Sequence, residues 1–130
     1  MNGNGGKRPE RRGGMRHAID AFGFSLKGLA ACFRTSTAFR QECLVLAAVV
    51  AVPMLAGFAF RDRFLLAAAW LGVMAIELLN SAVEEAVDMV SPQYDPKAGR
   101  AKDMASAAVL AAIAANAALW LGMAWERLAA

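Results

Sequence analysis

The segment ELLNSAVEEAVDMV, Glu77 to Val90, carries four carboxylates and one side-chain amide at the end of a long apolar run. On an α-helix of about 3.6 residues per turn, most of these polar side chains fall within one stripe, with Glu85 at its edge. The stripe consists of Glu77, Asn80, Ser81, Glu84 and Asp88. Such groups can hold a divalent cation through oxygen atoms, hold a proton, or line the path of an ion. Periodicity alone leaves these three possibilities open.

The depth of this segment argues for function. The uncharged run from Phe64 to Ile76 is too short to cross a membrane, and it reaches the required length of about 20 residues only by continuing to about Val87. An ionised side chain that faces lipid is unfavourable by a few kcal/mol or more, so it normally faces a bundle interior, water or a partner. Glu84, Glu85 and Asp88 could instead simply emerge into cytoplasmic water, but Glu77 lies two turns deeper.

The composition of the chain predicts an all-α membrane protein. Apolar residues make up 58% of the 130 residues and charged residues 19%, whereas soluble domains average about 45–50% and about 25%. Eight Lys and Arg residues precede the first long apolar run, which indicates a cytoplasmic N-terminus. A basic arm could also bind nucleic acid, but the membrane composition disfavours a nucleic-acid partner.

The expected elements follow from hydropathy and periodicity. Residues 1–14 are Gly-rich and basic and predict a disordered tail. Residues 15–36 place Ile19, Phe22, Leu26, Leu29 and Phe33 at helical spacing, which predicts an amphipathic helix that lies on the membrane surface or packs on protein. Three membrane spans are expected at about 40–60, 64–88 and 104–125. The domain as a whole covers 15–130.

The connections between the spans are expected to be polar. Arg61 to Arg63 predicts a short turn, and Ser91 to Asp103, with two prolines and a glycine, predicts a loop. Three spans then place the N-terminus and the second loop in the cytoplasm and the C-terminus outside. Arg100 and Lys102 would lie near the acidic stripe, and cations beside carboxylates suit a phosphorylated ligand held partly through a metal.

The sequence does not contain the motifs that several other kinds of active or metal site require. The sequence has no P-loop motif and a single histidine, His17, so neither a P-loop nucleotide site nor a paired-histidine site is possible. Cys32 and Cys43 form no C-x-x-C pair and are interpreted as small buried apolar residues. For an enzyme, these residue types support phosphoryl transfer by carboxylates, a metal and lysine.

The motifs ELLNSAVEEAVD and GRAKDMASAAVL, with SLKG and AFRQE upstream, closely resemble the small integral-membrane diacylglycerol kinases of bacteria. The likeness covers about His17 to Trp120. It implies a homotrimer of three-span subunits in the bacterial inner membrane, with active sites between subunits at the membrane–cytosol boundary. It also implies transfer of the γ-phosphate of MgATP to the hydroxyl of 1,2-diacylglycerol, which gives phosphatidic acid in phospholipid recycling.

The resemblance also implies roles for single residues. Glu77 matches the catalytic base, Asn80 a residue that supports it, Glu84 a ligand of the ATP-associated Mg²⁺ and Lys102 a phosphate contact. Nucleotide contacts are expected at His17, Phe24, Glu84, Gln93, Tyr94, Asp95, Lys102 and Asp103. Contacts with the lipid substrate are expected at Ser25, Phe39, Arg40, Gln41, Glu42, Glu77 and Ser106.

Two positions depart from the family pattern. Ser36 stands where the family carries a second metal-binding glutamate, and a hydroxyl is a poorer Mg²⁺ ligand, so either metal binding is weaker or Glu42 or water takes the place of that glutamate. His17 stands where relatives often have arginine. The alternatives are an undecaprenol kinase of the same family, which the AFRQE motif disfavours, and a catalytically weakened membrane scaffold or ion-binding member.

Overall fold

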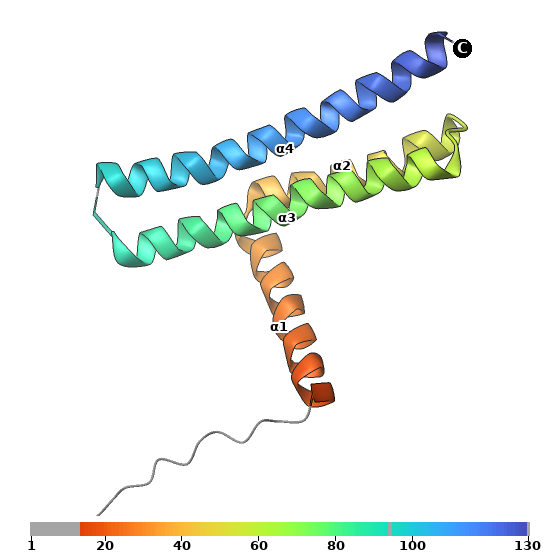
Figure 1. Cartoon of the computed structure of the whole chain (residues 1–130). Helices are drawn as coiled ribbons and strands as arrows, with labels where there is room; N and C mark the ends of the chain where they lie inside the picture. The colour runs from red at the N-terminus through yellow and green to blue at the C-terminus, as the bar shows by residue number, and fades with distance from the viewer. Residues whose placement is uncertain (1–13, 94, 130) are drawn as a thin grey trace, which may run out of the picture. The chain divides into compact units, whose positions relative to one another are not determined.

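The computed structural model describes residues 14–93 and 95–129, and four helices account for most of them (Figure 1). They are α1 (Gly14–Thr35), α2 (Thr37–Leu55), α3 (Phe60–Val90) and α4 (Pro96–Ala129), and no strand occurs among these residues. α2, α3 and α4 are each long and apolar enough to cross a membrane. The structure therefore confirms the predicted all-α class with three candidate spans. Residues 1–13 of the predicted tail lie outside the described part, and Gly14 already begins α1.

The chain divides into two compact units, residues 1–31 and 32–130. The described part of the first unit is the larger portion of α1, from Gly14 to Ala31. The large apolar side chains of the predicted face are exposed along this portion, among them Ile19, Phe22, Leu26 and Leu29. The second unit holds the last turn of α1 and the three long helices.

Local signals set both ends of α2. Ser36 is the N-cap, with extended backbone angles, and its hydroxyl accepts a hydrogen bond from the Phe39 amide at 3.0 Å. At the other end the Phe58 amide donates to the Pro53 carbonyl and the Gly57 amide to the Met54 carbonyl. This pair of bonds is a Schellman motif, and it requires the left-handed conformation that Gly57 adopts at φ 68°. α2 therefore ends at Leu55, two residues after Pro53.

The predicted turn at Arg61 to Arg63 is wrong, because these residues form the first turn of α3. The chain reverses earlier, over residues 56–59, where the Schellman motif ends α2. Arg127, near the end of α4, donates to the carbonyls of Ala56 and Gly57. This arginine therefore ties the last turn of α4 to the α2–α3 turn.

The predicted loop from Ser91 to Asp103 is also wrong in its second half, because α4 begins at Pro96. Asp95 accepts hydrogen bonds at Oδ1 from the amides of Lys97, at 2.6 Å, and Ala98, at 3.4 Å. Proline suits the first position of a helix because its missing N–H would have no partner there. An aspartate cap followed by proline thus starts a helix where the two prolines and the glycine suggested a loop. Lys102 and Asp103 are consequently on a helix.

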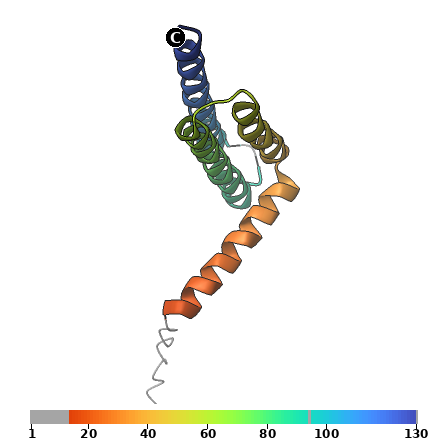
Figure 2. The same cartoon turned by 90° about the vertical axis from the view of Figure 1, so that its right-hand side faces the viewer.

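The three long helices pack through α3, which contacts both α4 and α2. Figures 1 and 2 show α4 running back along α3, with the α3–α4 connection at one end and the α2–α3 turn and the C-terminal end of α4 at the other. α2 begins beside the middle of α3 and covers only its first half. The second half of α3 and the start of α4 therefore extend beyond α2.

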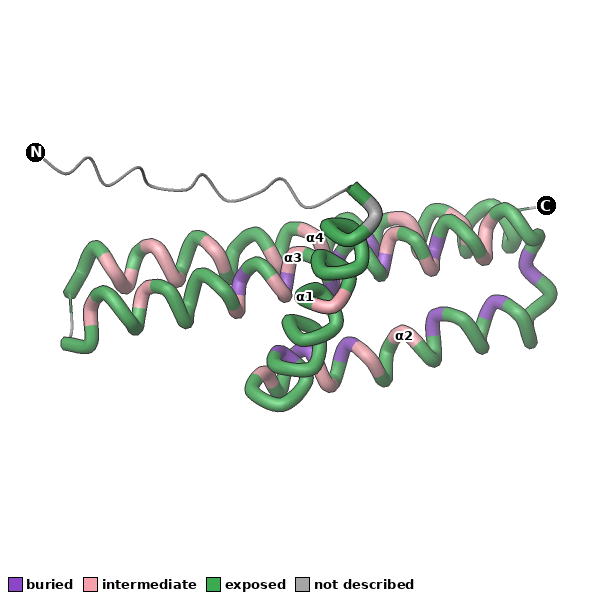
Figure 3. The backbone as a smooth tube through the Cα atoms, turned by 90° about the horizontal axis from the view of Figure 1, so that it is seen from below, coloured by how far each residue is buried: buried purple, intermediate pink, exposed green. Residues whose placement is uncertain are grey.

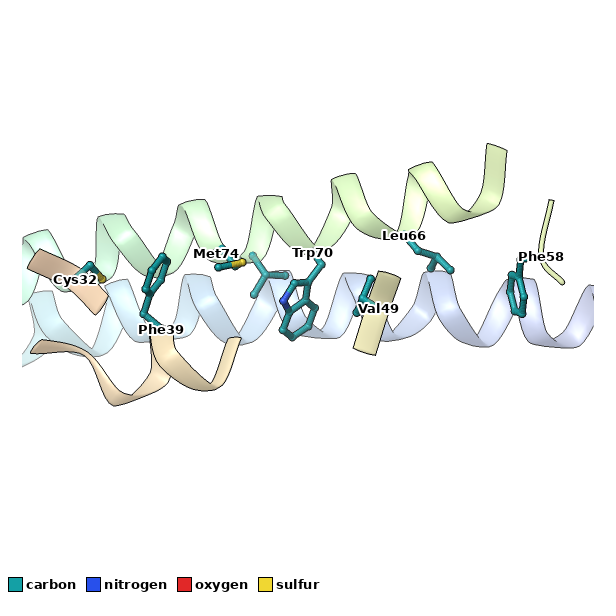
Figure 4. Packing of buried hydrophobic residues seen from close by; sticks show 8 residues of the cluster. Cys32, Phe39, Val49, Phe58, Leu66, Trp70 and Met74 are labelled. Carbon is teal, nitrogen blue, oxygen red and sulfur yellow. The ribbon is translucent and has the colours of Figure 1, made fainter. Parts of the chain in front are cut away.

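The buried core is small, and its residues come from the last turn of α1, from α2, from the α2–α3 turn and from α3, with partly buried side chains of α4 packed against them. It consists of Cys32, Phe39, Val49, Phe58, Leu66, Trp70, Val73 and Met74, most of which Figure 4 labels. The indole of Trp70 also donates to the Glu42 carbonyl at 3.0 Å. Along α4, by contrast, Asn116 is the single buried residue among those described, and Figure 3 shows most of the tube as exposed. Exposed apolar helix faces of this extent fit contact with lipid or with other membrane helices.

Candidate active site

A cavity of about 590 Å³ lies in the second unit where α2 begins. Residues 35–38, which span the junction of α1 and α2, form one side, and the polar stripe of α3 forms another. α4 contributes Ser106 and an apolar wall of Val109, Leu110 and Ile113. The five predicted stripe residues and Glu85 all line this cavity, so the structure brings them together as helical spacing predicted. One polar wall facing one apolar wall is a shape that fits an amphiphilic ligand.

Glu77 is the most deeply buried carboxylate of the stripe, with 4% of its surface exposed. Its Oε1 accepts a hydrogen bond from the Ser36 hydroxyl at 2.9 Å and a longer one from the Ser81 hydroxyl at 3.5 Å. Its Oε2 accepts from the Asn80 amide at 3.4 Å. A carboxylate that is buried and surrounded by donors can remain charged and keep a fixed orientation.

Asn80 lies between the two carboxylates to which the resemblance assigns catalytic and metal-binding roles. Its Nδ2 donates to Glu77 Oε2 and to Glu84 Oε1, each at 3.4 Å. These two acceptors fix the orientation of the amide, since the reversed orientation would place three oxygen atoms together. The buried Oδ1 then has no hydrogen-bond partner among the described residues. It is therefore an unpaired acceptor on a residue that lines the cavity.

The other two carboxylates of the stripe, Glu84 and Asp88, are exposed, as is Glu85 at its edge. Asp88 forms a salt bridge with Lys102, which joins the end of α3 to the second turn of α4. Lys102 is thus placed beside the cavity through its partner, although it does not line the cavity itself. Asp103 is exposed one residue further along α4.

The residues of the AFRQE motif occupy the first turns of α2. Phe39 belongs to the hydrophobic core, and Glu42 is 6% exposed, with Oε2 unpaired among the described atoms. Arg40 donates to the carbonyls of Phe33 and Arg34, in the last turn of α1. Gln41 is exposed. Arg40 thus braces the α1–α2 junction and Phe39 packs in the core, while the contact of these side chains with substrate stays a prediction.

The other predicted contacts are less closely grouped. His17, Phe24 and Ser25 are exposed residues of the first unit, where Ser25 donates to the Ala21 carbonyl and Lys27 lies over the Phe24 ring. Gln93 is exposed on the α3–α4 connection, and Asp95 caps α4. Tyr94 lies outside the described residues. Ser106 lines the cavity from α4.

Two contacts at the site were not predicted from the sequence. The buried Cys32 thiol donates to the Ser81 hydroxyl at 3.5 Å, which in turn donates to Glu77. Ser36, expected as a weak metal ligand, instead contacts the carboxylate assigned as the base. Ser81 was predicted as part of the stripe from its spacing to Glu77, but no sequence signal indicates that Cys32 or Ser36 reaches α3.

The residues present fit a metal that is shared with a ligand. Among the described residues no group of three or more His, Cys, Asp or Glu side chains is close enough to enclose a metal ion. Mg²⁺ is commonly held by one or two carboxylates together with water and phosphate oxygens. Glu84 supplies an exposed carboxylate on one wall of the cavity, and the unpaired amide oxygen of Asn80 lies on the same helix face.

Comparison with known proteins identifies the family of the chain. The family model described as prokaryotic diacylglycerol kinase matches residues 23–124. The chain is 39% identical to the diacylglycerol kinase of Escherichia coli K12 over 113 residues, which are 87% of this chain and 93% of the relative. It is 37% identical to the diacylglycerol kinase of Haemophilus influenzae, over 85% of this chain and 93% of the relative. It is 38% identical to that of Pseudomonas aeruginosa, over 82% of this chain and 87% of the relative.

These matches include the acidic stripe, the start of α4 and the AFRQE motif, and they confirm the resemblance seen in the sequence. Together with three helices able to span a membrane, they establish a multi-pass membrane protein. The chain belongs to the prokaryotic diacylglycerol kinase family.

Proposed function

We propose that this protein is an ATP-dependent lipid kinase of the bacterial inner membrane. It transfers the γ-phosphate of MgATP to the free hydroxyl of 1,2-diacylglycerol, and the products are phosphatidic acid and ADP. Such a reaction returns diacylglycerol to phospholipid synthesis. The names of the relatives support this substrate, and the cavity supports the chemistry.

The observation that carries the proposal is the environment of Glu77. This carboxylate is 4% exposed, accepts hydrogen bonds from three side chains and faces a cavity with one apolar wall. A general base must reach the proton that it removes, and an apolar wall can hold the acyl chains of the diacylglycerol whose glycerol hydroxyl carries that proton.

In the proposed reaction, the hydroxyl oxygen of diacylglycerol forms a bond to the γ-phosphorus. The bond between that phosphorus and the oxygen bridging to the β-phosphorus breaks, and its electron pair leaves with ADP. The hydroxyl proton passes to the Glu77 carboxylate. Asn80 keeps Glu77 and Glu84 in place from the same helix face.

The charge of the cavity explains why the nucleotide would bind as a metal complex. Four carboxylates line the cavity, and the triphosphate of ATP is also anionic, so cations must lie between them. Glu84 and Asn80 would hold the Mg²⁺, which would offset phosphate charge. Lys102, now paired with Asp88, would add a second cation at the same end of α3.

Helix lengths support a site at the membrane boundary. α2 has 19 residues, which gives a length of about 28 Å, close to the roughly 30 Å of a hydrocarbon core. If α2 crosses from Thr37 to Leu55, then Ser36 and Glu77 lie at one boundary of the core. The segment of α3 from Leu78 to Val90 then extends about 20 Å beyond it, which we propose is the cytoplasmic side. A diacylglycerol hydroxyl lies at this same depth.

An assay with two lipids tests the proposal. Purified protein in detergent micelles with MgATP would receive either a diacylglycerol or undecaprenol, and the phosphorylated lipid would be quantified. We expect phosphorylation of diacylglycerol to dominate. A clear preference for the polyprenol would instead identify an undecaprenol kinase and contradict the proposed substrate.

Glu77→Gln tests the role of the base in the same assay. The amide cannot accept the proton, and general base catalysis typically contributes about 10²- to 10⁴-fold, so we expect a loss of that order. Glu85→Gln is the matched control, since Glu85 lies at the edge of the stripe and is exposed, and it should retain most activity. Equal, background-level activity of the wild type and Glu77→Gln would mean that the chain has kept the fold without the catalysis.

A further inference from the structure

The hydroxyl of Ser36 contacts two groups at the start of α2. It accepts a hydrogen bond from the Phe39 amide at 3.0 Å, and it lies 2.9 Å from Glu77 Oε1. An amide can only donate and an ionised carboxylate can only accept, so the single proton of the hydroxyl must point to Glu77. The direction of both hydrogen bonds is thereby fixed.

The backbone holds this hydroxyl in place. The Ser36 amide donates to the Cys32 carbonyl at 2.8 Å, and Ser36 has the extended angles of an N-cap. Arg40 reaches back from α2 to the carbonyls of Phe33 and Arg34. The junction between the two helices is therefore braced on both sides of Ser36.

Ser36 differs from the other partners of Glu77. Ser81 and Asn80 lie on α3 itself, and their contacts are longer, at 3.5 and 3.4 Å. Ser36 supplies the shortest contact and the one that comes from another element. A glutamate side chain has three rotatable bonds, and a contact from its own helix moves with that helix. The Ser36 contact therefore fixes the carboxylate relative to α2.

We propose that Ser36 is a positioning residue for Glu77, and this inference rests on the kinase function proposed above. By holding Oε1, the hydroxyl turns the second oxygen, Oε2, toward the substrate hydroxyl. At the position where the resemblance implies a metal-binding glutamate, this chain thus carries a group that orients the base. Ser36 acts through Glu77 and need not contact the substrate.

Three substitutions separate this role from capping of α2. Ser36→Gly removes the hydroxyl but keeps a residue type that is common at N-caps, whereas Ser36→Ala removes both the hydroxyl and the cap. Ser36→Thr keeps both. Thermal unfolding of each purified variant in detergent would measure the effect on stability, and the kinase assay would give kcat and KM for MgATP and diacylglycerol.

We expect Ser36→Gly and Ser36→Ala to lower kcat by about tenfold or more, because a hydrogen bond to a charged group is lost, with KM values changed less than about twofold. Ser36→Thr should restore kcat to within about threefold of wild type. If kcat of Ser36→Gly matched the wild type, Ser36 would be a helix cap alone and the inference would fail. A rise in both KM values with kcat unchanged would also overturn it.

A double variant tests whether Ser36 acts through Glu77. In a Glu77→Gln background, Ser36→Gly should lower the residual rate less than about twofold, since the group that Ser36 positions is already gone. A full additional loss in that background would contradict the inference. An inactive wild type would refute the kinase function first, whereas an active wild type unaffected by Ser36→Gly would refute the positioning role alone.

Discussion

At the scale of single residues, Lys102 joins the acidic stripe to the start of α4. Its ammonium is paired with Asp88, and the side chains are 36% and 64% exposed, respectively. Exposed pairs of this kind contribute about 0–1 kcal/mol to stability, so the pair can open when a phosphate competes for the lysine. The salt bridge therefore keeps the Lys102 ammonium beside the cavity and contributes little to the packing of α3 against α4.

Lys102→Met should therefore affect nucleotide binding and leave stability nearly unchanged. We expect KM for MgATP to rise about tenfold or more, because a charge-assisted contact to phosphate is lost. The temperature of thermal unfolding should change little. Steady-state kinetics with varied MgATP and a thermal melt of the same preparation would measure both quantities.

Arg100→Met is the matched control for Lys102→Met, because Arg100 is an exposed cation two residues earlier on α4. It should leave KM for MgATP within about twofold of wild type. If both substitutions raised KM equally, the general positive charge of this segment would explain nucleotide binding, and a specific role for Lys102 would be wrong.

At the scale of elements, the α2–α3 turn depends on one glycine. Gly57 has φ 68° and lies in the Schellman motif that ends α2, while Arg127 donates to the Gly57 carbonyl from α4. Nothing lies within 4 Å of a Cβ built on Gly57. Any effect of a side chain there must therefore come from the backbone conformation and not from a steric clash.

Gly57→Ala should destabilise the protein by about 1–2 kcal/mol, because an L-residue is strained in the left-handed region. KM values should remain unchanged, since the turn lies at the opposite end of α3 from the acidic stripe (Figure 1). Thermal unfolding and kinase assays of the purified variant would measure the two effects.

Gly72→Ala provides the comparison within α3. A Cβ at Gly72 also meets nothing within 4 Å, but the backbone there is helical, so alanine should be neutral or slightly stabilising. Equal destabilisation by both substitutions would show that packing outside the single chain, and not the positive φ of Gly57, controls their effect.

At the scale of the whole molecule, the second unit leaves large apolar side chains exposed along every helix. Leu44 and Leu55 on α2, Leu79 on α3 and Leu110 and Leu121 on α4 are more than half exposed. Asn116 is 5% exposed and its Nδ2 has no partner among the described residues. Lipid can cover the apolar surface, but copies of the chain would cover it as well and bring further groups to the cavity.

We expect a homotrimer, as the resemblance implies. The detergent-corrected mass of the purified protein should be close to three times the 13.8 kDa of one chain. Light scattering combined with refractive index and absorbance would measure this mass. A fully active protein with the mass of a single chain would contradict both the trimer and the placement of active sites between subunits.

The sequence by itself determined the helices, the candidate spans and the alignment of the acidic stripe. These features depend on local periodicity and on the apolar length that a membrane requires, and both can be counted along the chain. Two helix boundaries were predicted wrongly, because the prediction relied on the average polarity of the connecting segments. The chain instead ends α2 with a Schellman motif at Gly57 and starts α4 with the cap formed by Asp95 and Pro96.

The tertiary structure alone decided which side chains meet across helices. Ser36 and Glu77 are 41 residues apart, and Asp88 and Lys102 are 14 apart, so no periodicity relates them. Their contacts depend on where α2 begins along α3 and on how α4 returns beside it. Packing therefore places the Ser36 hydroxyl against Glu77, the proposed base, a contact that the residue type of Ser36 and its place in the sequence did not indicate.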